Sequence, residues 1–206
     1  LLQYIAQLAL KLNEYYPENE IKMLSEHKNE LKISRKYIAS LVAGGFYCIY
    51  PYRENHKDIH EHNFDNFFHY NNYKDNIMRE KIKFYLNYVS RLKKEENDDP
   101  KGYIHIIKSR ITNIDEELKK LILSEKCMSN VEISENILIE ERNQCSYVNF
   151  VNKYLKGGCM RYGCAQGEIL FSIFPELFGV RFVNSSMMNY NESIISYNIL
   201  KFIINI

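Results

Sequence analysis

The sequence lacks several features that would assign it at once to a class of protein. It contains no tryptophan, so a core must take its aromatic bulk from 17 tyrosines and 11 phenylalanines. No apolar run approaches the length that crosses a bilayer. The formal net charge is only +1, whereas proteins that bind nucleic acid through a general basic field need more. We therefore expect no membrane insertion and no direct nucleic-acid binding, although a local anion site is compatible with this charge.

Disulfide and metal frameworks are also missing from the pattern. The five cysteines are an odd number without regular spacing, and no secretory leader pattern opens the chain, so we expect a reducing, intracellular setting. Four histidines lie close together, but no carboxylate or cysteine completes a recognisable ligand spacing. We expect no metal at these histidines, which are His56, His60, His62 and His69.

The expected secondary structure changes near residue 95, from helices alone to strands alternating with helices. Before it, apolar residues recur at helical spacing over 1–15, 34–48 and 78–92, with Ser34 as a candidate N-cap. A charged loop over 93–102 follows. Beyond that loop we expect strands at 103–107, 131–139, 147–152 and 193–197, and helices at 115–123, from 168, and at 175–183.

These elements predict an α/β fold. A helical region over 1–95 would pack on an α/β core over 96–206, either as two regions or as one structural unit. Both ends of the chain lie inside apolar patterns, so we expect a fragment whose core is incomplete at the C-terminus. No internal repeat is present, and nothing in the sequence predicts the oligomeric state.

A glycine-rich loop carries the clearest functional signal. Gly157 and Gly158 are adjacent, which lets main-chain N–H groups approach a ligand closely. Glu168 stands at the head of the apolar run 169–174, where we expect a helix to begin. Such a loop and helix N-terminus can hold a diphosphate, and a carboxyl group beside it can transfer protons. The pattern predicts a nucleotide-sugar site, although the glycine pair alone fits an ordinary strand, turn and helix.

The residues around this loop resemble the catalytic domain of poly(ADP-ribose) glycohydrolase. In that family a strand ending in Asp-Phe-Ala-Asn precedes three glycines and then a Gln-Glu-Glu motif. The corresponding residues match in register without a gap and are Asn149-Phe150-Val151-Asn152, Lys156-Gly157-Gly158 and Gln166-Gly167-Glu168. Phe174-Pro175-Glu176-Leu177 and the segment 46–51 are also similar, so the resemblance extends over about residues 30–197.

The resemblance implies a macrodomain-like mixed sheet flanked by helices, with an N-terminal helical extension. It also implies hydrolysis of the ribose–ribose O-glycosidic bonds of poly(ADP-ribose), without a cofactor, in the nucleus or cytoplasm. The substrate would be poly(ADP-ribose) or ADP-ribosylated proteins. By the same resemblance Glu168 is the general acid and base. The implied substrate-binding residues are Asn149, Phe150, Asn152, Gly157, Gly158, Gln166 and, as part of an adenine-contacting pair, Glu140.

The chain departs from the family pattern in ways that leave three functions open. Gly167 stands where the family has the first Glu of the pair, Asn149 replaces an acid, and Lys156 replaces the first glycine. The segment after residue 197 does not match the family's continuation, which bears an adenine-stacking tyrosine. The protein is therefore a glycohydrolase, an ADP-ribose-binding module that no longer cleaves, or a truncated copy without activity.

Overall fold

The computed structural model describes residues 1–15, 23–25, 29–51, 62–68, 75–95, 102–127, 130–142, 145–149, 155, 158–184 and 188–201. The α-helices are α1 (Leu2–Leu10), α2 (Leu12–Tyr15), α3 (Arg35–Phe46), α4 (Asp75–Glu95), α5 (Ile114–Ile122), α6 (Gln166–Ile173) and α7 (Leu177–Val183). Short 3₁₀ turns among the described residues are η1 (Asp65–Phe67) and η3 (Ile139–Glu141). The strands are β1 (Glu30–Ser34), β2 (Tyr103–Arg110) and β3 (Glu192–Tyr197).

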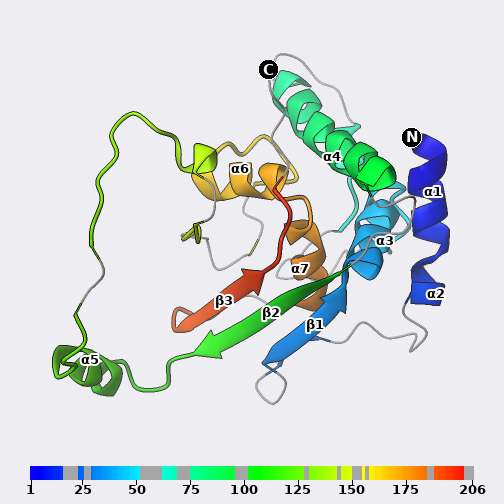
Figure 1. Ribbon diagram of the computed structural model, residues 1–206. Coiled ribbons are helices and arrows are strands. Elements are labelled where there is room, and N and C mark those ends of the chain that lie inside the picture. Colours follow the sequence, from blue (N-terminus) through cyan, green and yellow to red (C-terminus); the bar gives the residue numbers. More distant parts are fainter. Residues whose placement is uncertain are drawn as a thin grey trace.

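The three strands form one antiparallel sheet in the order β1-β2-β3 (Figure 1). Alternate side chains point to opposite faces of a strand, and one face carries the buried pairs Leu31 opposite Ile106 and Ile33 opposite Ile104. These four side chains belong to the apolar core that the helices share. The predicted α/β class with a helical N-terminal region is confirmed, while both ladders of the described sheet are antiparallel rather than mixed.

Helix α3 is the centre of the helical part. Ser34 caps it as predicted, since its Oγ accepts a hydrogen bond from the Tyr37 N–H at 3.3 Å. Almost every residue from Arg35 to Phe46 is buried, as expected of a helix that is covered on all sides. Helix α3 lies between α1 and α7 (Figure 1). Gly179 of α7 allows close contact, because a Cβ there would lie 2.5 Å from Ile38 Cδ1.

A buried ion pair joins the helical part to the segment around α7. Arg35 Nε donates to Glu176 Oε1 at 2.6 Å, and the Glu176 side chain is completely buried. The other carboxylate oxygen accepts from the Leu200 N–H at 2.8 Å, and Arg35 Nη2 donates to the Asn198 carbonyl at 2.6 Å. The guanidinium and the carboxylate are thus satisfied by main-chain groups as well as by each other, which buried charges require.

One predicted strand is wrong, and another is not found in the part of it that the structure describes. The described residues of 131–139 form no strand, and η3 occupies the end of that stretch. Val131 and Ile133 are exposed, at 79% and 86% of their surface. Of the predicted strand at 147–152, residues 147–149 are described and form no strand, while 150–152 lie outside the described residues. Both stretches have the composition of strands, but residues 131–139 and 147–149 pair with no described strand, and strand residues need such pairing.

The other predicted elements are confirmed with small shifts of their ends. One helix that the pattern extends over 1–15 is interrupted at Lys11 and becomes α1 and α2. Strand β1 was not predicted, although Glu30–Ser34 alternates polar and apolar residues. The boundary expected between residues 95 and 96 stays a prediction. Strand β1 before it pairs with β2 after it.

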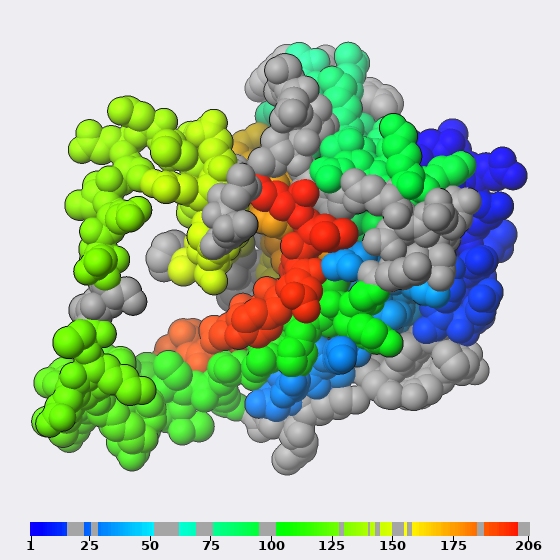
Figure 2. All heavy atoms as spheres, in the orientation of Figure 1, coloured from blue at the N-terminus to red at the C-terminus, as the bar shows by residue number. Residues whose placement is uncertain are grey.

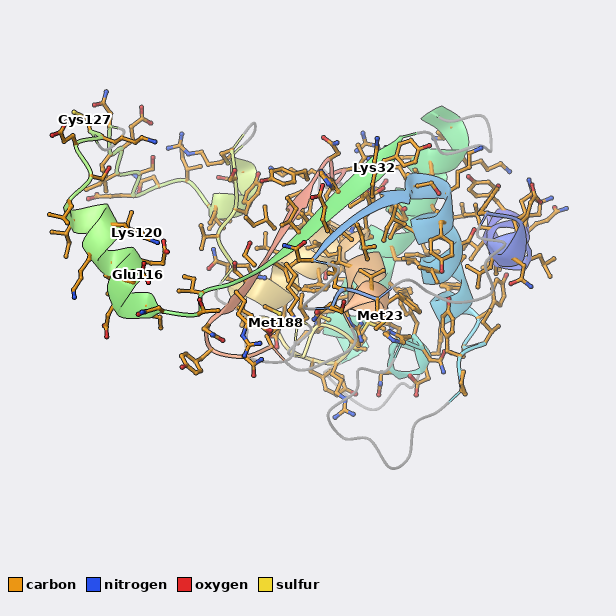
Figure 3. The ribbon with its side chains drawn as sticks, turned by 90° about the horizontal axis from the view of Figure 1, so that it is seen from below. Met23, Lys32, Glu116, Lys120, Cys127 and Met188 are labelled. Atoms are coloured by element: carbon orange, nitrogen blue, oxygen red, sulfur yellow. The ribbon has the colours of Figure 1, made fainter. Side chains whose placement is uncertain are left out.

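Helix α5 stands away from the rest of the molecule. Figure 2 shows it on an arm at one side, and Figure 3 shows Glu116 and Lys120 of this helix far from Met23 and Met188 in the body. Asn113 caps the helix, since its Oδ1 accepts from the Glu116 N–H at 3.2 Å. None of its residues is buried, so the helix is stabilised locally, by its cap and by the surface pairs of Lys120 with Glu116 and Glu117.

Candidate functional site

Glu168 lies in the first turn of α6 and is folded back against the glycine-rich loop. Its Oε2 accepts a hydrogen bond from the Ala165 N–H at 2.8 Å, and its Oε1 accepts one from the Gly158 N–H. The side chain is half-buried. Residue 168 is the third residue of α6 and Ala165 is its N-cap, so the carboxylate satisfies a main-chain N–H that the helix itself leaves free. The carboxylate is therefore held in one place by two main-chain donors.

The loop that presents Gly158 is a tight turn. The Gly158 carbonyl accepts from the Arg161 N–H at 2.8 Å and from the Gly163 N–H at 3.2 Å. Gly158 and Gly163 both lie against the Glu168 carboxyl group, where neither position has room for a side chain. A Cβ at Gly158 would lie 2.8 Å from Oε1, and a Cβ at Gly163 would overlap the carboxyl carbon and both oxygens. Both glycines are thus required for the observed position of the carboxylate.

A lysine from α4 lies under the same loop. Lys81 Nζ is 2.5 Å from the Gly163 carbonyl oxygen, 2.6 Å from that of Arg161 and 3.1 Å from that of Cys159. The Gly158 carbonyl oxygen is 3.4 Å away. Lys81 is buried, and this burial lowers the pKa of its ammonium, against the opposing influence of Cys159, Cys164 and Glu168.

Gly167 and Asn149, which both differ from the family pattern, lie against each other. A Cβ on Gly167 would overlap Asn149 Oδ1 and would lie 3.1 Å from both Asn149 Cγ and Nδ2. The side chain of Asn149 therefore fills the space that any larger residue at position 167 would need. The segment 147–149 is tied to α6 by Tyr147, whose ring centroid lies 5.3 Å from that of Phe174.

The structure brings together some of the predicted site residues. Gln166, Gly167 and Glu168 form the first turn of α6, and Gln166 is exposed there. Gly158 contacts the Glu168 carboxylate, so its N–H can reach a diphosphate only if that carboxylate moves. The backbone of Glu140 lies in η3, and its adenine contact stays a prediction. Phe150, Asn152 and Gly157 lie outside the described residues.

Two residues of the site were missed by the sequence analysis, namely Lys81 and Gly163. The position of Lys81 in the sequence could have indicated its burial. It follows Met78 by three residues and precedes Tyr85 by four, so it lies on the same helical face as these two buried residues. A lysine on the buried stripe of a helix needs a partner. Gly163 lies between the two recognised motifs, and only the fold shows that it faces Glu168.

Among the described residues, no three His, Cys, Asp or Glu side chains come together as a possible metal site. Of the four clustered histidines only His62 is described, and its ring stacks on Phe182 with 4.0 Å between centroids. Within the described part of the chain, none of the helices combines the length and apolar character that crossing a bilayer requires.

Two family models match the chain and together cover most of it. The model described as "Poly (ADP-ribose) glycohydrolase (PARG), helical domain" matches residues 1–108. The model described as "Poly (ADP-ribose) glycohydrolase (PARG), Macro domain fold" matches residues 118–204. The helical match therefore ends within β2, and the macro-fold match includes the glycine-rich loop and α6.

Three curated relatives are also described as poly(ADP-ribose) glycohydrolases. The chain is 32% identical over 108 residues to "Poly(ADP-ribose) glycohydrolase 1" of Caenorhabditis elegans, covering 49% of this chain and 12% of that protein. It is 33% identical over 99 residues to "Poly(ADP-ribose) glycohydrolase 2" of the same organism, covering 48% and 20%. It is 29% identical over 166 residues to "Poly(ADP-ribose) glycohydrolase 1" of Arabidopsis thaliana, covering 79% and 29%. The chain thus aligns with less than a third of each relative.

Proposed function

The chain belongs to the poly(ADP-ribose) glycohydrolase family, and we propose from this that it hydrolyses the ribose–ribose O-glycosidic bonds of poly(ADP-ribose). Glu168 is the proposed general acid and base. The observation that carries the proposal is that Glu168 lies at the N-terminus of α6 and is held against the glycine-rich loop by Gly158 and Ala165. ADP-ribosylated proteins in the nucleus or cytoplasm are the proposed source of substrate.

The proposed reaction has two steps at one anomeric carbon. The protonated Glu168 carboxyl group gives its proton to the ribose oxygen that leaves, while the C–O bond breaks and positive charge develops on the anomeric carbon. The Glu168 carboxylate then takes a proton from a water molecule as the water oxygen attacks that carbon. Each carboxylate oxygen has a second acceptor site besides the one that a main-chain N–H occupies, and the transferred proton would use such a site.

A turnover assay tests this function directly. The protein is incubated with labelled poly(ADP-ribose), and released ADP-ribose is separated and counted. We expect product that increases linearly with the protein concentration. Absence of product above a blank without protein would overturn the proposal.

A second candidate function is an ADP-ribose-binding module that no longer cleaves. It is favoured by Gly167, because the family glutamate that it replaces would supply a charge-assisted hydrogen bond. Such a bond contributes about 1.5–3 kcal/mol, and its complete loss in the transition state would slow the reaction by about ten- to a hundred-fold. Calorimetry with ADP-ribose, beside the turnover assay, distinguishes the two functions, since the module binds without forming product.

Restoring the family glutamate should increase turnover, and the size of the increase should depend on Asn149. A side chain at position 167 meets the Asn149 amide, so we expect a small gain from Gly167→Glu alone. In an Asn149→Ser background the shorter side chain leaves room, and the gain should approach about ten- to a hundred-fold. Asn149→Ser alone is the control. Equal turnover of all four proteins would show that position 167 does not contribute to the reaction.

Adding one methyl group at Gly163 should displace the proposed acid/base. The Cβ of Gly163→Ala would overlap the Glu168 carboxyl group, so the carboxylate would have to leave its two main-chain donors. We expect kcat to fall by about ten- to a hundred-fold, because a displacement of about 1 Å can cost that much. The control is Cys164→Ala at the next, exposed position. Unchanged kcat in Gly163→Ala would contradict the assigned position of Glu168.

A further inference from the structure

The carbonyl groups of the glycine-rich loop converge on one ammonium group. Lys81 Nζ lies within 3.1 Å of the carbonyl oxygens of Cys159, Arg161 and Gly163. An ammonium has three protons and no acceptor, so these three carbonyls can take all of them. The fourth carbonyl, that of Gly158 at 3.4 Å, lies close enough to be attracted by the charge. The loop is thus wrapped around a cation that another part of the chain supplies.

This arrangement differs from that of an ordinary helical lysine. Lys83, two residues further along α4, is half exposed and pairs with Glu80 at the surface. Lys81 is buried in α4 beneath the loop, where an ammonium without acceptors would be strongly unfavourable. Carbonyl oxygens that face each other repel, so four of them would not converge on one point without a positive charge between them. The ammonium and the turn therefore depend on each other.

The turn that Lys81 holds is also the one that holds Glu168. Gly158 contributes its carbonyl to the surroundings of Lys81 and its N–H to the Glu168 carboxylate. Gly163 contributes its carbonyl to Lys81, and its Cα packs against the same carboxylate. A change in the conformation of this turn therefore moves both the Gly158 N–H, which donates to the Glu168 carboxylate, and Gly163, which packs against it.

We propose that Lys81 is a positioning residue for the reaction, and that its ammonium sets the loop geometry that places the Glu168 carboxylate. The inference rests on the proposed function only for its effect on turnover; its effect on the loop is independent of it. The helical part of the protein thus contributes to the site through Lys81 of α4, whose ammonium holds the loop. Lys81 itself does not need to contact substrate.

The test compares three variants with the unaltered protein. Lys81→Met keeps the length and the apolar stem but removes the charge, Lys81→Arg keeps a charge, and Lys83→Met removes a charge from the same helix at its exposed face. The readouts are the amide resonances of Gly158 and Ala165, which report their hydrogen bonds to Glu168, and kcat and KM for poly(ADP-ribose). Thermal melting measures the folded fraction of each protein.

The proposal predicts a specific combination of results. In Lys81→Met both amide resonances should move, and kcat should fall by at least about tenfold per folded molecule, as for a misplaced catalytic group. Lys81→Arg should restore part of the kcat and bring both amide resonances part of the way back. Lys83→Met should match the unaltered protein in both readouts. Unmoved amides in a folded Lys81→Met protein, or a loss of kcat that only follows the unfolded fraction, would overturn the proposal. If the unaltered protein releases no ADP-ribose, the proposed function fails while the amides still decide the role of Lys81.

A measurement on the unaltered protein covers the case in which Lys81→Met does not fold. Because burial lowers the pKa of Lys81, its ammonium loses its proton at a lower pH than an exposed lysine does. The titratable groups facing it are Cys159 and Cys164 on the loop and Glu168 on α6. The Gly158 amide and kcat should therefore change together on the alkaline side, below the pH at which an ordinary exposed lysine side chain loses its proton. Their constancy up to that pH would overturn the proposal.

Discussion

Replacing Glu168 by Gln should reduce the release of ADP-ribose by about 10²- to 10⁴-fold, the range that one general acid and base contributes. The amide of Gln has nearly the size of the carboxyl group but can neither donate a proton to the leaving oxygen nor take one from water. The control is Glu125→Gln, which removes the same charge from an exposed position. Equal turnover of Glu168→Gln and the unaltered protein would exclude Glu168 as the acid and base.

The same variant should show a local defect besides the chemical one. Both carboxylate oxygens of Glu168 accept from main-chain N–H groups, whereas one end of a Gln side chain is itself a donor. One of the two N–H groups, that of Gly158 or that of Ala165, would therefore lose its partner. Binding of ADP-ribose by calorimetry and the melting temperature separate this local change from the loss of proton transfer, since the chemical defect appears only in turnover.

Removing one partner of the Arg35–Glu176 pair should have the largest effect on stability. Arg35→Met leaves the completely buried Glu176 carboxylate without its cation, and such changes cost about 3–5 kcal/mol of unfolding free energy. Chemical denaturation measures the loss. The matched control is Lys83→Met, which breaks the exposed pair with Glu80 and should cost at most about 1 kcal/mol. A loss of similar size in both variants would show that the buried pair has no special role.

A double variant separates the net contribution of the ion pair to the free energy of unfolding from the penalty of leaving one buried charge unpaired. Arg35→Met combined with Glu176→Met removes both charges, and buried pairs replaced by apolar residues are often neutral in stability. We therefore expect the double variant to be more stable than Arg35→Met alone. It would still leave the Leu200 N–H and the Asn198 carbonyl without the partners that the pair supplies. The remaining deficit relative to the unaltered protein includes the loss of those two hydrogen bonds.

This pair also gives a physical reason for one of the sequence similarities. The segment Phe174-Pro175-Glu176-Leu177 resembles the family, but the sequence alone does not say what its glutamate does. In the structure Glu176 connects α7 to Arg35 of α3 and to the chain after β3. Through these contacts Glu176 holds α3, α7 and the chain after β3 together.

The sequence by itself determined most of the helices and the motif proposed as the site. Helical spacing placed α3, α4, α5 and α7 to within a few residues, because a helix is stabilised by contacts three and four residues apart that the sequence displays directly. The sequence also places Glu168 and Gly158 in one continuous motif, and the structure brings the two into contact, while their roles stay a prediction.

Only the tertiary structure decided which strands form and what surrounds Glu168. The stretches 131–139 and 147–152 have the composition of strands, yet their described residues have no neighbouring strand to pair with, and such pairing depends on distant parts of the chain. Lys81 lies more than seventy residues before the loop whose carbonyl groups it holds, so no local pattern can connect them. The sequence determines which groups can donate, accept or carry charge, and the fold determines which of them meet.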